Sequence, residues 1–169
     1  MRRVLVVLLS VIAGVAFTMA SASAVPPTST TRDGGLHFVG RPNLTVVGSV
    51  EEGTVALRAT GEVAGAGTTA TATLSADAVV TTGCINRGAQ DQQPSGLQRE
   101  TTTVLGSQEF NTRQGRGTFD VTTNAITLDR ICPDQMTPVL VSVEFTNIVL
   151  TVTSQTGTIT ATFPDQTAS

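Results

Sequence analysis

Apolar and polar residues alternate with a period of two along most of the chain, and this period predicts β-strands. The clearest run extends from Ala70 to Val80, where apolar residues at even positions alternate mostly with threonine, serine and aspartate. Such alternation is typical of a strand with one buried and one solvated face. Its parity places Cys84 on the buried face. No helical period appears outside the N-terminal segment, so the pattern indicates an all-β chain.

Two hairpins are predicted from apolar positions that match across a four-residue loop. One loop comprises residues 51–54 and the other residues 154–157. The expected cross-strand neighbours are Val50–Val55, Gly48–Leu57 and Val46–Ala59 in the first hairpin, and Val152–Ile159, Leu150–Ala161 and Ile148–Phe163 in the second. In each hairpin these apolar residues share one face.

A third hairpin and one irregularity complete the strand pattern. The hairpin has its tip at residues 113–116 and sets Phe110 opposite Phe119. Further along, the parity of the apolar positions switches between Phe145 and Ile148. Such a switch requires a β-bulge, or a bend that carries the strand from one sheet to the other.

Seven to nine short antiparallel strands with polar turns predict a β-sandwich, immunoglobulin-like with Greek-key connections. A partly closed β-barrel is the alternative architecture. The sandwich is expected to span residues 36–164. A flexible linker is expected before it, at residues 25–35, and a disordered tail after it, at residues 165–169.

The first 24 residues have the three parts of a secretory signal peptide. Arg2 and Arg3 provide a positive start, residues 4–17 are almost wholly apolar, and small residues follow. The apolar run is shorter than the ~20 residues of a membrane-spanning helix. We expect cleavage after Ala24, with Ala22 as the alternative, and a secreted product without a membrane attachment.

Cys84 and Cys132 are the two cysteines of the chain, and export to an oxidising compartment predicts that they form a disulfide. The chain-entropy model assigns a bridge across this spacing roughly 4 kcal/mol. A redox pair or a metal site is not favoured, because there is no Cys-x-x-Cys spacing and His37 is the sole imidazole. We therefore expect no metal and no other cofactor.

The export signal, the LHFVG segment at residues 36–40, the isolated cysteine pair and the Thr/Val-rich strands occur together in this chain. The combination resembles small secreted immunoglobulin-like β-proteins of high-GC Gram-positive bacteria, across most of residues 36–164. Those proteins carry no assigned activity. The resemblance therefore implies a fold and a location, and it implies no functional residue.

Patterns that would indicate catalysis are weak. The glycine-rich segment at residues 65–67 precedes a strand pattern, whereas a dinucleotide fingerprint requires a helix N-terminus there. His37 is expected on the surface, without the nucleophile and orienting carboxylate of a hydrolytic triad. The acidic residues that could form a glycosidase pair are scattered: Asp91, Glu100, Glu109 and Asp120. We expect no catalytic residue and no enzyme activity.

Composition narrows the classes of partner. The chain has no Trp and no Tyr, which argues against the stacking platforms that bind sugars and single-stranded nucleic acid. After export, eight arginines remain against 13 acidic residues. A net negative surface argues against DNA, RNA or anionic lipid as a partner. The 30 threonines fit the solvated faces of strands.

Two polar loops remain as candidate binding sites, because sandwich loops commonly carry binding residues. One is the segment 86–98, and the other is the hairpin tip at 113–116, whose arginines could hold a carboxylate or phosphate. A charged tip can equally serve only to keep a turn soluble. The candidate residues are Asn86, Arg87, Asp91, Gln92, Arg113 and Arg116.

The predicted function is that of a secreted, non-enzymatic module that binds an unknown extracellular protein or small ligand, or acts at a surface. We expect it to be monomeric. The alternative is a small-molecule carrier similar to the secreted antibiotic apoproteins, which share the sandwich architecture.

Overall fold

The computed structural model describes residues 23–86, 88 and 93–169. The predicted signal segment at residues 4–17 and the alternative cleavage site at Ala22 lie outside these residues. All regular structure within the described ranges is β-strand. No helix in these ranges is long and apolar enough to cross a membrane.

The described residues form eleven strands, seven of them with six or more residues. The seven longer strands are β3 (Asn43–Ser49), β4 (Thr54–Ala64), β5 (Thr69–Asn86), β6 (Ser95–Asn111), β7 (Gly117–Thr122), β9 (Met136–Ser154) and β10 (Gly157–Thr162). The four shorter strands are β1 (Ser29–Thr30), β2 (His37–Phe38), β8 (Ile126–Thr127) and β11 (Gln166–Ala168). The longer strands match the predicted number, whereas the short ones have too few residues for an alternating pattern.

The strands form two antiparallel sheets that are not closed into a barrel. The larger sheet has the order β1-β10-β9-β5-β6, with β11 paired to β9. The smaller sheet is built on β4, which pairs with β2 and β3 along one edge and with β7 and β8 along the other. The predicted all-β antiparallel class with one disulfide is confirmed.

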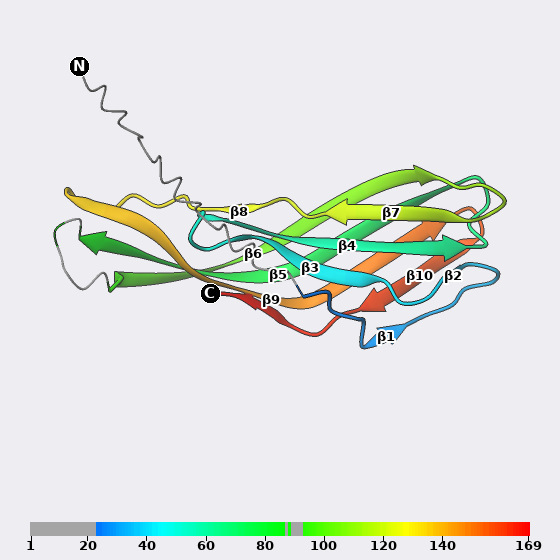
Figure 1. Cartoon of the computed structure of the whole chain (residues 1–169), viewed down its shortest axis with the longest axis horizontal. Coiled ribbons are helices and arrows are strands. Elements are labelled where there is room, and N and C mark those ends of the chain that lie inside the picture. Colours follow the sequence, from blue (N-terminus) through cyan, green and yellow to red (C-terminus); the bar gives the residue numbers. More distant parts are fainter. Residues whose placement is uncertain (1–22, 87, 89–92) are drawn as a thin grey trace, which may run out of the picture.

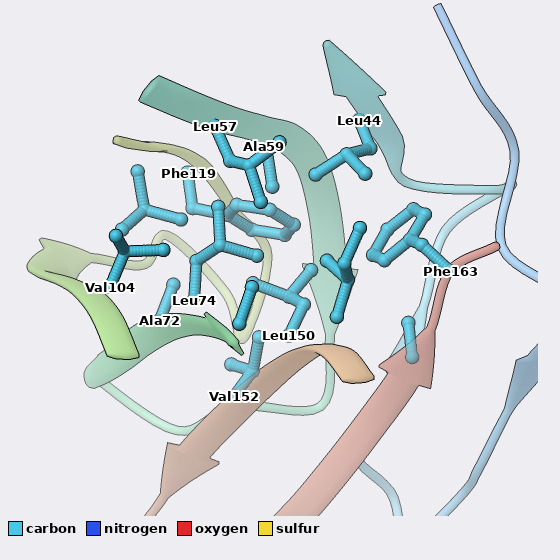
Figure 2. Packing of buried hydrophobic residues seen from close by; sticks show 14 of the residues in the cluster. Leu44, Leu57, Ala59, Ala72, Leu74, Val104, Phe119, Leu150, Val152 and Phe163 are labelled. Atoms are coloured by element: carbon cyan, nitrogen blue, oxygen red, sulfur yellow. The ribbon is translucent and has the colours of Figure 1, made fainter. Parts of the chain in front are cut away.

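The core lies between the two sheets and is filled by aliphatic side chains from both. The even positions of β5, from Ala70 to Ala78, are at most 3% exposed and face the smaller sheet. Figure 2 shows Leu74 and Leu150 of the larger sheet packed against Leu57 and Ala59 of β4. Fully burying one such leucine stabilises the fold by roughly 1.5–3 kcal/mol, so this layer supplies much of the stability.

The hairpin of β9 and β10 has the predicted register. Val152 lies opposite Ile159 and Leu150 opposite Ala161. The Phe163 N–H donates to the Ile148 carbonyl at 3.0 Å. The alternation therefore located both the turn and the buried face.

The hairpin of β3 and β4 corrects the predicted register by two residues. Val55 lies opposite Gly48 rather than Val50, and the turn comprises residues 50–53. Gly53 adopts a left-handed φ of 69°, and its N–H donates to the Val50 carbonyl at 3.1 Å. Because glycine takes this conformation without strain, the turn ends at Gly53. β4 therefore begins at Thr54, which was predicted to be the last residue of the loop. A shift by two leaves each side chain on its predicted face.

The third predicted hairpin is wrong beyond its tip. β6 pairs with β5 in the larger sheet, whereas β7 pairs with β4 in the smaller one. Phe110 and Phe119 are therefore not cross-strand neighbours, although their rings meet across the core at 6.0 Å. The predicted pairing would have set Glu109 opposite Asp120. In the structure Asp120 instead pairs with Arg58 of β4.

The predicted irregularity in β9 is a β-bulge. Ser75 of β5 lies opposite Val149, whereas Asp77 lies opposite Thr146, so β9 carries an extra residue there. Asn147 has a positive φ of 52°, and its side-chain amide donates to Asp77 Oδ2 at 2.9 Å. The bulge re-aims the strand and restores apolar residues to the core face.

Short strands lie within the segments expected as a linker and as a tail. β1 pairs with β10, and Val25 exchanges two backbone hydrogen bonds with Leu44. Near the C-terminus, β11 pairs with β9. These segments are held by backbone pairing with the edges of longer strands. They can therefore form strands without an alternating pattern of apolar side chains.

Candidate functional site

The two ends of β6 lie at opposite ends of the molecule, one near Asn86 and the other near the tip at residues 113–116 (Figure 1). β6 runs from one to the other over 17 residues, which at ~3.3 Å per residue is about 50 Å. The structure thus keeps Asn86, the described candidate of the first loop, far from Arg113 and Arg116 of the tip. Asn86 and the tip therefore cannot contribute to the same binding site.

The tip at residues 113–116 is a tight turn tied to β4. Arg113 and Arg116 exchange two backbone hydrogen bonds, and the turn residues Gln114 and Gly115 have φ values of 53° and 76°. Arg116 Nε donates to Glu62 Oε1 at 2.9 Å. The exposed Arg113 side chain has no hydrogen-bond or ion-pair partner within the described part of the chain. The tip thus presents one unpaired guanidinium, not an arginine pair.

The other predicted loop is shorter than expected. β6 begins at Ser95, so the last four residues of the segment 86–98 belong to a strand. Asn86 ends β5, and its Oδ1 accepts the Gly88 N–H at 3.2 Å. Arg87, Asp91 and Gln92 lie outside the described residues.

Beyond this loop, β5, β6 and β9 continue past the end of the smaller sheet (Figure 1). We call residues 80–86, 95–103 and 136–142 of these strands the arm. The segment 128–134 is fastened to it by the predicted disulfide between Cys84 and Cys132. The arm therefore has a covalent tie where the rest of the larger sheet has a packed second layer.

Arg130 is a second tie between the segment 128–134 and the arm. Its Nη1 donates to the Thr82 carbonyl at 2.9 Å, and its Nη2 donates to the Gly96 carbonyl at 2.6 Å. Its Nε is buried and has no hydrogen-bond partner among the described residues. Sequence reasoning missed this residue, whose one local signal is its position two residues before Cys132.

A cleft opens on the side of the molecule between β6 and residues 124–130. Its volume is about 300 Å³. At one end it is bounded by Asn124, which bonds to β6, and at the other by Arg130. The residues that line it are Val80, Thr82, Gln98, Glu100, Thr102, Asn124, Ala125, Ile126, Thr127, Asp129 and Arg130. This lining is mixed, with two carboxylates, one guanidinium and several hydroxyl and amide groups.

Among the described residues, the edge of β6 beside the cleft has no strand partner. β6 is the last strand of its sheet, and residues 95–103 are all exposed. The Leu105 N–H donates to Asn124 Oδ1 at 2.7 Å, and its carbonyl accepts the Asn124 N–H at 2.9 Å. Because backbone groups of successive strand residues point to opposite edges, Arg99, Thr101 and Thr103 also direct theirs away from β5.

Natural sheets usually protect such an edge with lysine, proline or a covering loop. Over residues 97–103, this edge has no lysine and no proline. The Arg99 guanidinium extends back across the sheet to Glu144, with both oxygens at 3.2 Å. The open edge therefore presents backbone donors and acceptors that a further strand could use.

A second concavity, which we call the groove, borders the β3–β4 turn. This groove has a volume of about 420 Å³. Apolar residues form most of it, and two carboxylates belong to the turn. The residues that line it are Val50, Glu51, Glu52, Gly53, Ile85, Pro94, Leu128, Pro138, Val139, Leu140 and Val141. An apolar ligand is the kind of molecule that such a surface accommodates.

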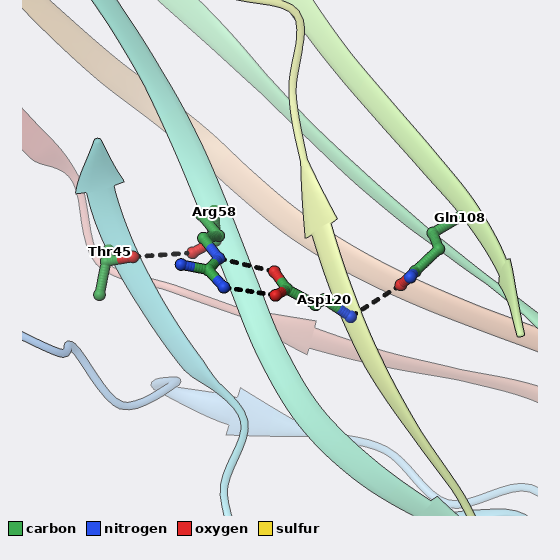
Figure 3. Close-up of polar contacts among 4 residues, drawn as sticks. All are labelled: Thr45, Arg58, Gln108 and Asp120. Carbon is green, nitrogen blue, oxygen red and sulfur yellow. Dashed lines mark hydrogen bonds and ion pairs between the residues drawn. The ribbon is translucent and has the colours of Figure 1, made fainter. Parts of the chain in front are cut away.

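The clearest electrostatic feature joins β4 to β7 on the solvated face of the smaller sheet (Figure 3). Arg58 donates to both carboxylate oxygens of Asp120, with Nε to Oδ1 at 2.6 Å. This hydrogen bonding lowers the pKa of Asp120 and raises the pKa of Arg58. The Asp120 N–H donates to Gln108 Oε1 at 2.7 Å, which links β7 to β6. The ion pair thus ties two neighbouring strands of the smaller sheet, and the Gln108 bond ties β7 to the larger sheet.

His37 is half-buried on β2, and its Nδ1 lies 2.8 Å from the Gly35 carbonyl oxygen. The described residues contain no group of three or more His, Cys, Asp or Glu side chains placed to hold a metal ion. The histidine contact is thus a local one, between a ring nitrogen and the backbone two residues earlier.

No family model, no curated protein and no solved structure matches this chain. The geometry of the cleft, the free edge and the groove therefore carries the functional argument.

Proposed function

We propose that this protein is a secreted, non-enzymatic, immunoglobulin-like β-sandwich that acts as a binding or surface-associated module. The single observation that carries the proposal is the open side of the sandwich, where the free edge of β6 borders the cleft. Secretion rests on the predicted signal peptide. The disulfide supports it, because such bonds persist in oxidising compartments.

An open strand edge and an adjacent cleft are the two parts of a strand-accepting site. In such sites backbone hydrogen bonds to the edge supply affinity, and pockets beside the edge select side chains. Arg99, Thr101 and Thr103 supply outward backbone groups. The cleft places Glu100 and Asp129 beside them, so it favours a partner with polar or cationic side chains there.

The pairing of charges elsewhere is consistent with this assignment. Three arginines of the described structure bind carboxylates of other strands. The pairs are Arg58–Asp120, Arg99–Glu144 and Arg116–Glu62. These side chains tie parts of the fold together, whereas the outward backbone groups at Arg99, Thr101 and Thr103 of the β6 edge are available to a partner.

A photo-crosslinking residue at Thr101 tests the proposal. The full chain is secreted from its host, and crosslinked products in the medium are compared with those from the same group placed at Thr151, on the solvated face of a central strand. We expect an extracellular partner to be captured from position 101 and not from position 151. Equal capture at both positions, or no capture at position 101, would contradict the proposal.

The groove supports a second candidate function, that of a small-molecule carrier. Its apolar lining and its volume of about 420 Å³ are suited to a small apolar ligand. The space between the sheets is an unsuitable place for one, because residues such as Leu57, Leu74 and Leu150 fill it and are fully buried.

Nile red, a neutral apolar dye, tests the carrier function. We expect its fluorescence to rise with the native chain and not with Val141→Glu, which places a charge in the groove. Val149→Glu is the matched control, since this half-buried valine of β9 lies outside the groove. Equal fluorescence with all three proteins, or none with the native chain, would rule the carrier function out.

A further inference from the structure

The rim of the groove carries two negative charges that no cation of the described chain balances. Glu51 and Glu52 line the groove from the β3–β4 turn, and both residues are exposed. Neither side chain has a hydrogen-bond or ion-pair partner among the described residues. None of the residues that line the groove is basic. At neutral pH the groove therefore combines an apolar wall with an unbalanced negative rim.

We propose that the groove binds a cationic amphiphile, which is a small molecule with a hydrocarbon part and a positively charged head group. The inference rests on the carrier function proposed above, since it names the class of ligand that is carried. The hydrocarbon part packs on the apolar wall, and the head group lies beside Glu51 and Glu52. An apolar surface with a few placed polar groups is the usual composition of a small-molecule site.

The apolar wall of the groove is continuous with an exposed leucine of β6. All lining residues other than the turn residues 51–53 are apolar. A Cβ atom on Gly83 would lie 2.7 Å from Pro94 Cβ, 3.2 Å from Leu97 Cδ2 and 3.5 Å from Val141 Cγ2. These three side chains therefore converge over the glycine, and Leu97 is 59% exposed. Contiguous exposed apolar surface of this kind marks a binding region, and here it extends the wall available to a hydrocarbon chain.

The walls of the groove are held in place without a ligand. The Leu128 N–H donates to the Gly53 carbonyl at 3.1 Å, which fastens one wall to the β3–β4 turn. On the other side, Cys84 lies opposite Pro138 of β9 and forms the disulfide to Cys132. A site that is fixed before binding avoids the cost of ordering its own residues. The groove is therefore suited to a small ligand that offers few contacts.

The size of the groove favours a small molecule over a protein segment. Its volume of about 420 Å³ falls in the range of small-molecule sites, roughly 300–1,000 Å³. Stable protein interfaces bury about 1,200–2,000 Å² of surface, which requires a wider contact than one groove beside a turn. We therefore assign the groove to a free amphiphile.

The two carboxylates select the sign of the head group. One exposed ion pair contributes little to affinity. An anionic head group, however, is repelled by the same two charges that attract a cationic one, so the two kinds of ligand differ by more than one pair. We expect the cation to bind about tenfold more tightly than the anion at low salt. The preference should largely disappear in ~1 M salt, which screens exposed charges.

Isothermal titration calorimetry of the secreted chain with three probes of equal hydrocarbon length is the first test. The probes are octyltrimethylammonium, octanol and octyl sulfate, all kept below the concentrations at which they aggregate. We expect affinity to fall in that order at low salt. Equal affinities for the three probes, or tightest binding of the sulfate, would overturn the proposal.

Variants of the rim separate the groove from the net charge of the protein. We expect Glu51→Gln combined with Glu52→Gln to abolish the preference for the cation and to leave octanol binding unchanged. Glu109→Gln combined with Asp165→Asn is the matched control, because it removes two exposed carboxylates outside the groove. We expect this control to keep the full preference. Far-UV circular dichroism checks that each variant has folded, and equal loss in both double variants would overturn the proposal.

Backbone amide NMR spectra locate the bound probe. On addition of octyltrimethylammonium, we expect the largest shift changes at residues 50–53 and 138–141, which lie on the two sides of the groove. The signals of the β9–β10 turn should stay in place. Shift changes centred on any other part of the chain would contradict the assignment of the groove.

The ligand class and the carrier function fail in different ways. If Nile red binds in the groove but the three octyl probes bind equally, the cationic class is rejected and the carrier function stands. If neither Nile red nor any octyl probe binds, both are rejected. A short peptide of alternating leucine and lysine is the competing occupant. If it binds more tightly than octyltrimethylammonium, the groove accepts a protein segment and the small-molecule ligand is rejected.

Discussion

The body of the sandwich and its arm use the same three strands in different ways. In the body, the even positions of β5 lie under the smaller sheet, and Leu74, Ala72 and Ala78 are fully buried. In the arm, residues 95–103 of β6 are all exposed. The body is held by apolar packing, whereas the arm is held by the disulfide and by the hydrogen bonds of Arg130.

The difference shows how one sheet can combine stability with an open edge. Where strands are buried between two sheets, apolar packing holds them, and no specific tie at a strand edge is required. An uncovered edge needs local ties, because few apolar contacts hold it. Cys132 and Arg130 supply these ties from a single segment, and the outward backbone groups of β6 stay available to a partner.

Removal of the disulfide should have the largest effect on stability. We expect Cys84→Ala with Cys132→Ala to lower the free energy of unfolding by roughly 4 kcal/mol, the chain-entropy cost of the released loop. Urea unfolding followed by circular dichroism measures the change. A loss below ~1 kcal/mol would show that the arm is held by other contacts.

Substitutions of leucine should separate the body from the arm. Leu74→Ala leaves a cavity in the core, and we expect it to cost about 3 kcal/mol. Leu97→Ala removes an exposed side chain of the arm, and we expect a change within about 0.5 kcal/mol. The same urea experiment compares the two variants. Similar costs at both positions would contradict the distinction drawn here.

Arg130 should matter more to the arm than to the body. We expect Arg130→Leu to cost about 2 kcal/mol, because charged hydrogen bonds to two backbone carbonyls are lost. Amide exchange should increase first in residues 95–99 of β6. Arg113→Leu, at the unpaired arginine of the tip, is the control and should leave both quantities nearly unchanged. Faster amide exchange throughout the body would instead show that Arg130 stabilises the whole fold.

The Arg58–Asp120 pair should produce the smallest effect. Arg58 lowers the pKa of Asp120 in the folded chain below its ordinary value of 3.8. The pair therefore stabilises the fold above about pH 4, and this contribution is lost as the pH falls through the lowered pKa. Both side chains are nearly half exposed, so the effect is small and screened by salt. In thermal melts at decreasing pH, Asp120→Asn should lack the loss of stability that this pair causes in the native chain. An identical pH dependence of the two proteins would show that the pair does not contribute.

Sequence periodicity was sufficient to predict the longer strands and their buried faces, but not the short strands β1, β8 and β11. It located the β9 bulge and the β9–β10 register, because those depend on parity. It did not determine the β3–β4 register, since a shift by two preserves every face. It also could not show that β6 and β7 belong to different sheets, which depends on partners distant in sequence such as Arg58 for Asp120.

The candidate site was less predictable than the fold. The polarity of residues 86–98 and 113–116 was visible, but the placement of Asn86 and of the tip at opposite ends of β6 was not. The free edge follows from strand order, and strand order leaves no mark in the composition of β6. Arg130 was missed for a similar reason: its partners are backbone carbonyls of Thr82 and Gly96, which carry no signal in the sequence.

Amide hydrogen exchange along β6, measured residue by residue, tests the central claim of an open edge most directly. In dilute solution we expect Glu100 and Thr102, which bond to β5, to be protected, and Arg99, Thr101 and Thr103 to exchange rapidly. Uniform protection of all five amides in dilute solution would contradict an open edge.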